Sequence, residues 1–265
     1  MWSDFYNGAM NTDQGLRLAQ AVREVKARSK CKILVLMGGL DFFSNGINLN
    51  TIEASSDPAQ ESWRNINAID DAVKEVLMCR DKVTISAMLG NAGAGGIMAA
   101  LAADFVWTHG TAVVSPSYKK MDLFGSEYWT YSLPKRVGSK VAMELTNCTE
   151  PMSSQHALKL GLVDKVLCPN YSDFVPNVFA AAEELAESQQ LKDVLVEKSS
   201  RDWVVFEEKI KLHRKFELDK MKECFRSDGY NTKRAMFVYK SNLLPCCNSS
   251  EDQNSRVTRK ATMHA

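Results

Sequence analysis

The sequence predicts an α/β fold with mostly parallel strands, because short apolar runs alternate with amphipathic helical patterns along most of the chain. Two continuous, mostly apolar runs of strand length, residues 32–38 and 82–89, are typical of strands covered on both faces. A glycine-containing loop and then a helical pattern follow each run. This repeated order of strand, loop and helix predicts parallel strands joined by crossover helices.

The remaining elements follow in chain order. Thr12 can cap a first helix, and a second is expected over residues 62–77, since apolar side chains recur there at helical spacing. Residues 104–116 predict short strands broken at His109–Gly110. Helical patterns then cover residues 126–137, 140–146, 178–188 and 202–225, and a short helix and strand cover residues 154–167.

We expect three parts along the chain. Residues 1–170 hold all the strand signals and form the core, and residues 171–243 form a helical region. Residues 244–265 are polar and aperiodic, and a disordered tail is expected there.

Composition and charge exclude several classes of protein. The 265 residues are 45% hydrophobic with a formal net charge of +1, which gives no electrostatic reason for binding nucleic acid or an anionic membrane. The seven cysteines form no CxxC pair and the four histidines lie far apart, so no metal site is expected. No apolar run approaches the ~18–20 residues of a membrane span, and the N-terminus lacks signal-peptide features. We therefore expect a cytoplasmic protein.

A glycine cluster, residues 90–96 (GNAGAGG), links the strand at 82–89 to the next helix. Its spacing fits neither the dinucleotide-binding G-x-G-x-x-G pattern nor a phosphate-binding loop. The glycines either allow tight packing of helix against strand or let a ligand approach unpaired N–H groups at the helix start. Residues 42–49 (FFSNGINL) form a second loop at a strand end. Two such loops can converge on one carbonyl oxygen as an oxyanion hole, which favours the second interpretation.

These two loops, with residues 134–167, resemble the crotonase (enoyl-CoA hydratase/isomerase) superfamily, and the resemblance runs from about residue 5 to residue 168. It implies the superfamily's ββα spiral core, a coenzyme A (CoA) thioester as substrate and no metal. The first strand hairpin of that fold has no counterpart in this sequence, so an open sheet edge is expected.

The resemblance also implies roles for residues of the two loops. The N–H groups of Ile47 and Gly95 would form the oxyanion hole. The backbone around Asn45, in the loop that includes Gly46 and Asn48, would face the adenine of CoA.

Hydratases of the superfamily use two glutamates flanking a water, and the resemblance places Met98 and Ser117 at those positions. Neither side chain serves as an acid or base near neutral pH, so water addition is not expected. Glu127 is the candidate acid/base, with a pKa raised by burial among aromatic side chains, and Tyr118 is a candidate hydrogen-bond donor. Alternatively, Glu127 is a solvated residue in the first turn of a helix and Tyr118 is structural.

A larger part of the chain, about residues 5–240, resembles the crotonase-like C-terminal half of hydrogenase maturation factors of the HypX (HoxX) type. Residues 41–71, 90–104 and 125–138 carry this resemblance together with the late helical region. It implies a lyase that releases carbon monoxide from formyl-CoA. The formyl-transfer half of that family has no counterpart in this sequence, so a separate formyl-transfer protein is the expected partner.

Two other functions stay open. The first is an enoyl-CoA hydratase/isomerase-type or hydrolase activity with Glu127 as the sole acid/base. The second is a non-catalytic CoA-binding or scaffold protein, suggested by Met98 and Ser117. Crotonases commonly form trimers or dimers of trimers, so a homo-oligomer is a further expectation from the resemblance.

Overall fold

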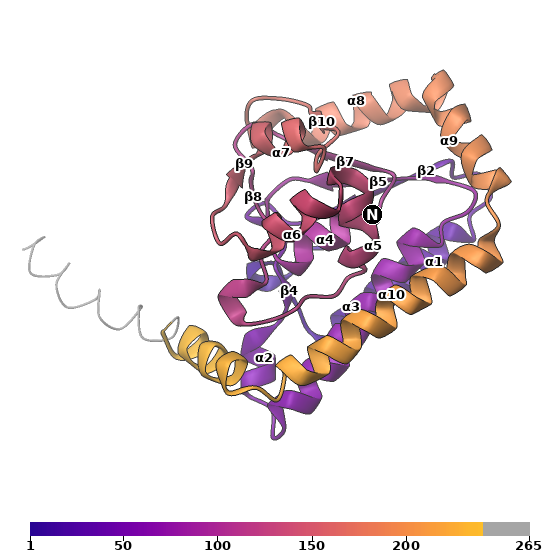
Figure 1. Ribbon diagram of the computed structural model, residues 1–265. Helices are drawn as coiled ribbons and strands as arrows, with labels where there is room; N and C mark the ends of the chain where they lie inside the picture. Colours follow the sequence, from indigo (N-terminus) through magenta and orange to yellow (C-terminus); the bar gives the residue numbers. More distant parts are fainter. Residues whose placement is uncertain (241–265) are drawn as a thin grey trace, which may run out of the picture.

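A computed structural model describes residues 1–240 of the chain, and a parallel sheet forms its centre (Figure 1). This four-stranded sheet has the order β10-β7-β5-β2, and every neighbouring pair in it is parallel. Its strands are β2 (Ile33–Met37), β5 (Val83–Met88), β7 (Phe105–Thr108) and β10 (Lys165–Val166). The prediction of an α/β fold with mostly parallel strands is confirmed.

A second four-stranded sheet has the order β3-β6-β8-β9, and only the β8–β9 pair in it is antiparallel. Its strands are β3 (Phe42–Ser44), β6 (Asn91–Gly93), β8 (Val113–Ser115) and β9 (Met152–Ser153). The chain passes from β2 to β3, from β5 to β6 and from β7 to β8, so it winds through both sheets as a spiral. The β5–β6 turn needs Gly90, because a Cβ there would overlap backbone atoms of Asp41 and Phe42.

A short parallel pair joins β1 (Ala9–Met10) to β4 (Gly46–Ile47). The first residues also cover part of the edge of β2 that the sequence predicts to be open. The Met1 ammonium donates to the Val35 carbonyl at 2.7 Å, and Ser3 N donates to the Met37 carbonyl at 2.9 Å. These bonds satisfy backbone groups that an exposed edge would leave unpaired.

Helices surround the two sheets. Those before the last strand are α1 (Thr12–Lys26), α2 (Leu49–Glu53), α3 (Pro58–Leu77), α4 (Gly95–Ala100), α5 (Trp129–Val137), α6 (Ser139–Asn147) and α7 (Ser154–Leu160). Beyond it lie α8 (Phe174–Glu187), α9 (Gln189–Ser200), α10 (Trp203–Cys224) and a helical segment at residues 228–240. The 3-10 turns are η1 (Tyr6–Gly8), η2 (Lys119–Met121) and η3 (Tyr171–Asp173).

The predicted helices are confirmed, with two differences that bear on the site. Asn11, rather than Thr12, caps α1 in a capping box with Gln14. The helix expected from residue 126 begins at Trp129, because Glu127 and Tyr128 have left-handed backbone angles (φ 61° and 59°). The tail predicted at residues 244–265 lies outside the described residues.

Helix α10 runs along α3, from one end of the molecule to the other (Figure 1). Arg214 of α10 donates to Asp71 Oδ1 at 2.6 Å and to the Asn67 carbonyl at 3.1 Å, and Lys74 donates to Glu207 at 2.8 Å. These contacts dock α10 on α3, which itself contacts β4.

Candidate active site

The two loops singled out in the sequence meet in the structure. Gly46 begins β4 and Gly95 begins α4. A Cβ placed on Gly46 would lie 3.6 Å from the backbone nitrogen of Gly95 and 3.5 Å from its Cα. Since the first N–H groups of a helix have no partner within it, the Gly95 N–H is suited to donate a hydrogen bond to a ligand oxygen. Ile47 adjoins Gly46, so both predicted oxyanion-hole residues lie at this junction.

The carboxyl group of Glu127 lies against the same two glycines. A Cβ on Gly95 would overlap Glu127 Oε1, and one on Gly46 would lie 3.8 Å from that atom. Glycine at position 95 therefore leaves the space that Oε1 occupies. Glu127 is 1% exposed and precedes α5, so it is not the solvated helix residue of the alternative interpretation.

Tyr118 holds the other oxygen of this carboxyl. Its hydroxyl donates to Glu127 Oε2 at 2.7 Å, and Ser126 N donates to the same oxygen at 3.2 Å. The Tyr118 ring packs against Gly125, where a Cβ would overlap the ring. Oε2 is therefore engaged by two donors, and Oε1 faces the glycine junction.

Two further carboxylates stabilise the left-handed turn that carries Glu127. Asp70 of α3 accepts hydrogen bonds from Ser126 Oγ at 2.8 Å and from Glu127 N at 2.9 Å. Glu217 of α10 accepts from Tyr128 N at 2.9 Å and from Thr130 N at 2.7 Å. Because left-handed angles are unfavourable for side chains of this size, these bonds compensate for backbone strain at the site.

Burial governs the ionisation of these groups. Burial, together with the smaller effect of the neighbouring charge of Asp70, raises the pKa of Glu127 to about 8. Burial also raises the pKa of Asp70 to about 6, against the opposing charge of Arg214. The pKa of Tyr118 lies well above its ordinary value because of burial and the charge of Glu127. Near neutral pH the site thus holds a charged Asp70, a mostly protonated Glu127 and a neutral Tyr118.

Side chains of α10 and the segment after it close the site. Met221 Sδ accepts a hydrogen bond from Gly125 N at 3.2 Å. Ile66, Leu218, Phe225 and Tyr230 form a buried cluster with Met221, and Ile47 packs at its margin. Glu127 itself is 1% exposed, so its carboxyl group is shielded from solvent.

Comparison with known proteins agrees with this geometry. Residues 7–243 match the family model described as enoyl-CoA hydratase/isomerase. The chain belongs to the enoyl-CoA hydratase/isomerase family. Enoyl-CoA hydratase from Bacillus halodurans shares the fold, with a TM-score of 0.74 over 86% of this chain and 90% of that one, at 21% sequence identity. The α/β architecture is thus that of the crotonase superfamily, as the resemblance implied.

Two relatives are more similar in sequence. Hydrogenase maturation factor HoxX of Bradyrhizobium diazoefficiens is 38% identical over 239 residues, which are 89% of this chain and 42% of that protein. HypX from Aquifex aeolicus, in a crystal structure with tetrahydrofolic acid, has a TM-score of 0.84 and 42% identity over 89% of this chain and 43% of that one. The chain therefore spans about two-fifths of the length of these relatives.

Met98 and Ser117, which the resemblance aligns with the glutamates of hydratases, are unsuited to activating water. Met98 is fully buried in α4, within the apolar cluster that also contains Val114 and Leu133. Ser117 is 6% exposed, and its hydroxyl has no hydrogen-bond partner among residues 1–240. Glu127, by contrast, brings a carboxyl group to the junction of Gly46 and Gly95.

The loop residues predicted to face CoA form hydrogen bonds within the protein in this structure. Asn45 donates to the Asn7 carbonyl at 2.8 Å, and Asn48 caps α2 by accepting from Thr51 N at 3.1 Å. An open cleft of about 660 Å³ lies beside Asn48, lined by η1, α2 and Val238. The loop thus forms one wall of a space large enough for the nucleotide end of CoA.

Sequence reasoning missed Asp70, Ser126 and Glu217. The signal for Asp70 is its position four residues after Ile66 and three before Val73, on the buried face of α3. Glu217 similarly lies between the buried positions Ile210 and Met221 of α10. A carboxylate at a core position of a helix needs partners, so both positions could have been flagged as structural or catalytic.

Proposed function

We propose that the chain binds a CoA thioester and acts as a lyase of the HypX type, releasing carbon monoxide from formyl-CoA. The observation that carries the proposal is the position of Glu127 Oε1, which lies against Gly95 while Oε2 is held by Tyr118. The thioester carbonyl would accept hydrogen bonds from the N–H groups of Ile47 and Gly95. One such donor typically contributes about 10²–10³ in rate.

The chemistry requires one proton shuttle. In its ionised form Glu127 takes the formyl hydrogen as a proton at Oε1, and the C–H electron pair becomes the lone pair on the carbon of carbon monoxide. The C–S bond breaks, and its electron pair stays on sulfur as the CoA thiolate. Glu127 then returns the proton to this thiolate, giving free CoA. A carboxyl with a pKa of about 8 suits both steps, because its acidity is close to that of a thiol.

The enclosure of the site supports lysis over hydrolysis. Glu127 is 1% exposed, and Met98 and Ser117 stand where hydratases carry acid/base groups. A site without activated water protects a formyl thioester from simple hydrolysis. Since the enclosed state leaves Glu127 almost inaccessible, entry of the acyl group requires side chains of α10 to move.

We further propose that the nucleotide end of CoA occupies the cleft beside Asn48 and the backbone around Asn45 and Gly46. The segment of β4 lies between the cleft and the Glu127 site, since Gly46 begins this strand near Glu127 Oε1 and Asn48, which follows the strand, lines the cleft. A CoA molecule could therefore extend from the adenine cleft to the oxyanion hole along this strand.

A second activity, isomerisation of an enoyl-CoA, is favoured by the same carboxyl. Moving a double bond needs a base that removes a proton from one carbon and returns it to another, and Glu127 alone could do both. A non-catalytic CoA-binding role remains the third candidate, because Met98 and Ser117 replace the hydratase glutamates.

The proposed reaction also implies a partner activity that supplies the substrate. A formyl-CoA lyase needs a formyl-transfer activity to supply its substrate, from a separate protein or from another part of a longer one. A homo-oligomer remains an inference from the family. Within residues 1–240, no helix is both long and apolar enough to cross a bilayer.

Incubation with formyl-CoA, with the gas trapped on haemoglobin, tests the proposed activity. We expect carbon monoxide above the enzyme-free blank. Turnover of an enoyl-CoA without carbon monoxide would favour the isomerase, and binding of CoA without turnover of either thioester would favour the non-catalytic role.

A further inference from the structure

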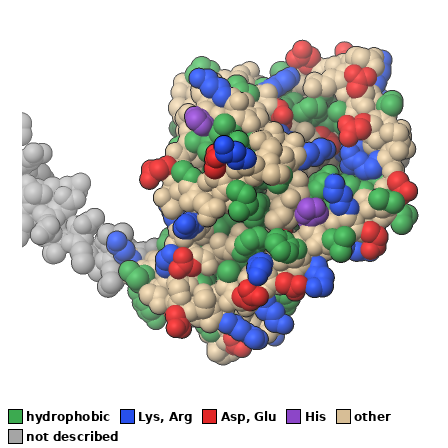
Figure 2. All heavy atoms as spheres, viewed as in Figure 1, with side chains coloured by type: hydrophobic (Ala, Val, Ile, Leu, Met, Phe, Trp, Pro, Cys, Tyr) green, Lys and Arg blue, Asp and Glu red, His purple; other side chains and the backbone are tan. Residues whose placement is uncertain are grey.

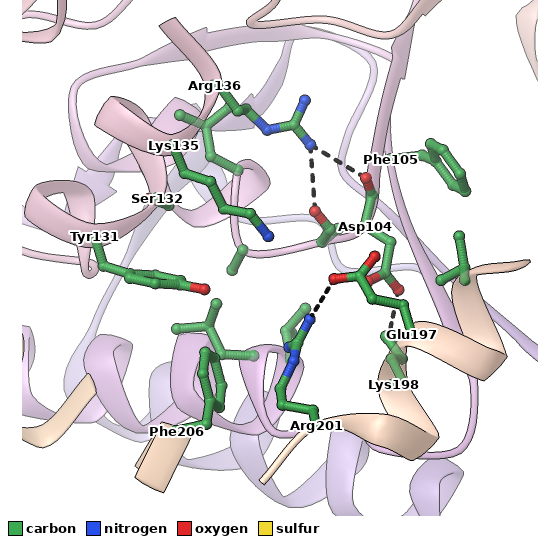
Figure 3. Close-up of a pocket in the computed structure, with 16 residues that line it drawn as sticks. Asp104, Phe105, Tyr131, Ser132, Lys135, Arg136, Glu197, Lys198, Arg201 and Phe206 are labelled. Carbon is green, nitrogen blue, oxygen red and sulfur yellow. Dashed lines mark hydrogen bonds and ion pairs between the residues drawn. The ribbon is translucent and has the colours of Figure 1, made fainter. Parts of the chain in front are cut away.

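A second cleft, of about 300 Å³, is lined by one face of α5, and Glu127 is not among its lining residues (Figure 3). It opens between α5, the segment before β7 and the junction of α9 with α10. Basic side chains gather on this face between α5 and α9 (Figure 2). Its charged lining residues are Lys135, Arg136, Lys198, Arg201, Asp104 and Glu197.

Two of the four cations are already neutralised. The Lys198 ammonium is buried and donates to Asp104 Oδ2 at 2.5 Å and to the Lys82 carbonyl at 2.7 Å. Arg136 pairs with Asp164 at 3.0 Å and also donates to the Asp104 carbonyl at 3.3 Å. These groups form the wall of the cleft and have little charge to offer a ligand.

Two other donors are uncommitted and point into the cleft. The Lys135 ammonium has no hydrogen bond or ion pair within the part of the chain that the structure describes, and Figure 3 shows it directed into the cavity. The Tyr131 hydroxyl points into the same space, again with no hydrogen bond to any described residue. Burial raises the pKa of Tyr131, so the hydroxyl stays protonated and able to donate.

Arg201 completes the set as a rigid donor. Its guanidinium lies 4.8 Å from the centre of the Phe206 ring and 5.1 Å from that of Trp203, which fixes its plane. It donates to Glu197 Oε1 at 2.9 Å through Nη2. The Glu197 side chain is 66% exposed, so it can turn into solvent when another anion arrives.

We propose that this cleft binds a small anion bearing a phosphate or carboxylate group. A guanidinium, an ammonium and a phenolic hydroxyl converging on one cavity form a donor set that matches oxyanion ligands. The cavity volume suits a molecule of metabolite size rather than a single ion.

The cleft is separate from the one proposed for CoA. Val76 and Leu77 line it at the C-terminal end of α3, whereas Asn48, in the wall of the CoA cleft, donates through its backbone N–H to Asn65 Oδ1, nearer the start of that helix. Asn65 and Val76 lie about 16 Å apart along the helix axis, and the two clefts share no lining residue.

Calorimetric titration with pyrophosphate and with citrate, at ionic strength matched with sodium chloride, tests the proposal. We expect saturable binding of at least one of them, at one site per chain. Lys135→Ala should weaken binding by about tenfold or more, since it removes a charged donor. Lys140→Ala, which removes an exposed lysine of α6 outside the cleft, should leave it unchanged.

Two further variants complete the binding experiment. Glu197→Gln removes the competing carboxylate and should tighten binding, while Glu127→Gln should have no effect, which separates this proposal from the proposed reaction. Absence of saturable binding by both anions, or equal affinity in Lys135→Ala and the parent, would overturn the proposal. Displacement of the bound anion by CoA would also overturn it, because the cleft would then belong to the CoA site.

Discussion

The Tyr118 hydroxyl lies 2.7 Å from Glu127 Oε2 and donates to it, which leaves Glu127 Oε1 against Gly95. Because Oε2 also accepts from Ser126 N, the proton of the neutral carboxyl resides on Oε1. Tyr118 thereby directs the exchangeable proton of Glu127 toward the glycine junction, where the proposed substrate carbonyl would lie.

Replacing Tyr118 with phenylalanine should shift the pH dependence of turnover to higher pH. The hydrogen bond from Tyr118 stabilises the ionised carboxyl, so its loss raises the pKa of Glu127 above about 8. The rate near neutral pH should fall by roughly tenfold or more, as expected for a lost hydrogen bond to a charged group. A pH–rate profile measures this. Tyr171→Phe, at an exposed position of η3, is the matched control and should keep the parent profile.

Replacing Asp70 with asparagine should move the same inflection to lower pH. The negative charge of Asp70 raises the pKa of Glu127, and asparagine removes that charge while keeping one oxygen that accepts from Ser126 Oγ. The pH–rate profiles of this variant and of Tyr118→Phe should therefore shift in opposite directions. A shift of both in the same direction would contradict the assignment of Glu127 as the titrating group.

Alanine at position 95 should displace the Glu127 carboxyl. The new Cβ would overlap Oε1, so overpacking should cost about 1–3 kcal/mol in the free energy of unfolding. Turnover should be lost at the same time. Urea unfolding measures the cost, and the double variant Gly95→Ala/Glu127→Ala, which removes the clashing carboxyl, should recover stability without recovering activity. Full activity in Gly95→Ala would show that Oε1 does not need its present position.

Stability should fall as pH rises through the range in which Glu127 ionises. Its pKa is about 8 in the folded protein against 4.5 for an ordinary glutamate, so the folded state binds the proton more tightly. The stabilisation is complete below about pH 4.5 and is lost as the pH rises through 8. Asp70 acts in the same direction over a lower window, from 3.8 to about 6. Urea midpoints measured from pH 5 to 9 should decline, and Glu127→Gln should flatten the part of the decline above pH 6.

Much of the fold could be predicted from the sequence because its signals are local. The apolar runs of β2 and β5 and the periodic face of α3 each lie within one continuous segment. The start of α5 could not be placed in this way. Glu127 and Tyr128 adopt left-handed angles because Asp70 and Glu217, from two distant helices, bind their backbone N–H groups.

In the candidate site, too, local features could be predicted from the sequence and tertiary contacts could not. The two glycine-containing loops are visible in the sequence, and the resemblance to the crotonase superfamily singles out Gly95 and Glu127 within the segments that carry them. Their mutual contacts depend on the spiral path of the chain, which sequence periodicity does not specify. Asp70 and Glu217 appear as ordinary helical charges until the packing of α3 and α10 buries them. Their roles follow from tertiary structure alone.

The most direct test of the account compares the parent protein with Glu127→Gln on formyl-CoA, recording trapped carbon monoxide and free thiol in the same reaction. The parent should release both in equal amounts. The variant should lose about 10²–10⁴ in rate while binding CoA with unchanged affinity, since only proton transfer is removed. Thiol released without carbon monoxide by the parent would indicate hydrolysis, and unchanged rates in Glu127→Gln would exclude Glu127 from the reaction; either result would contradict the account.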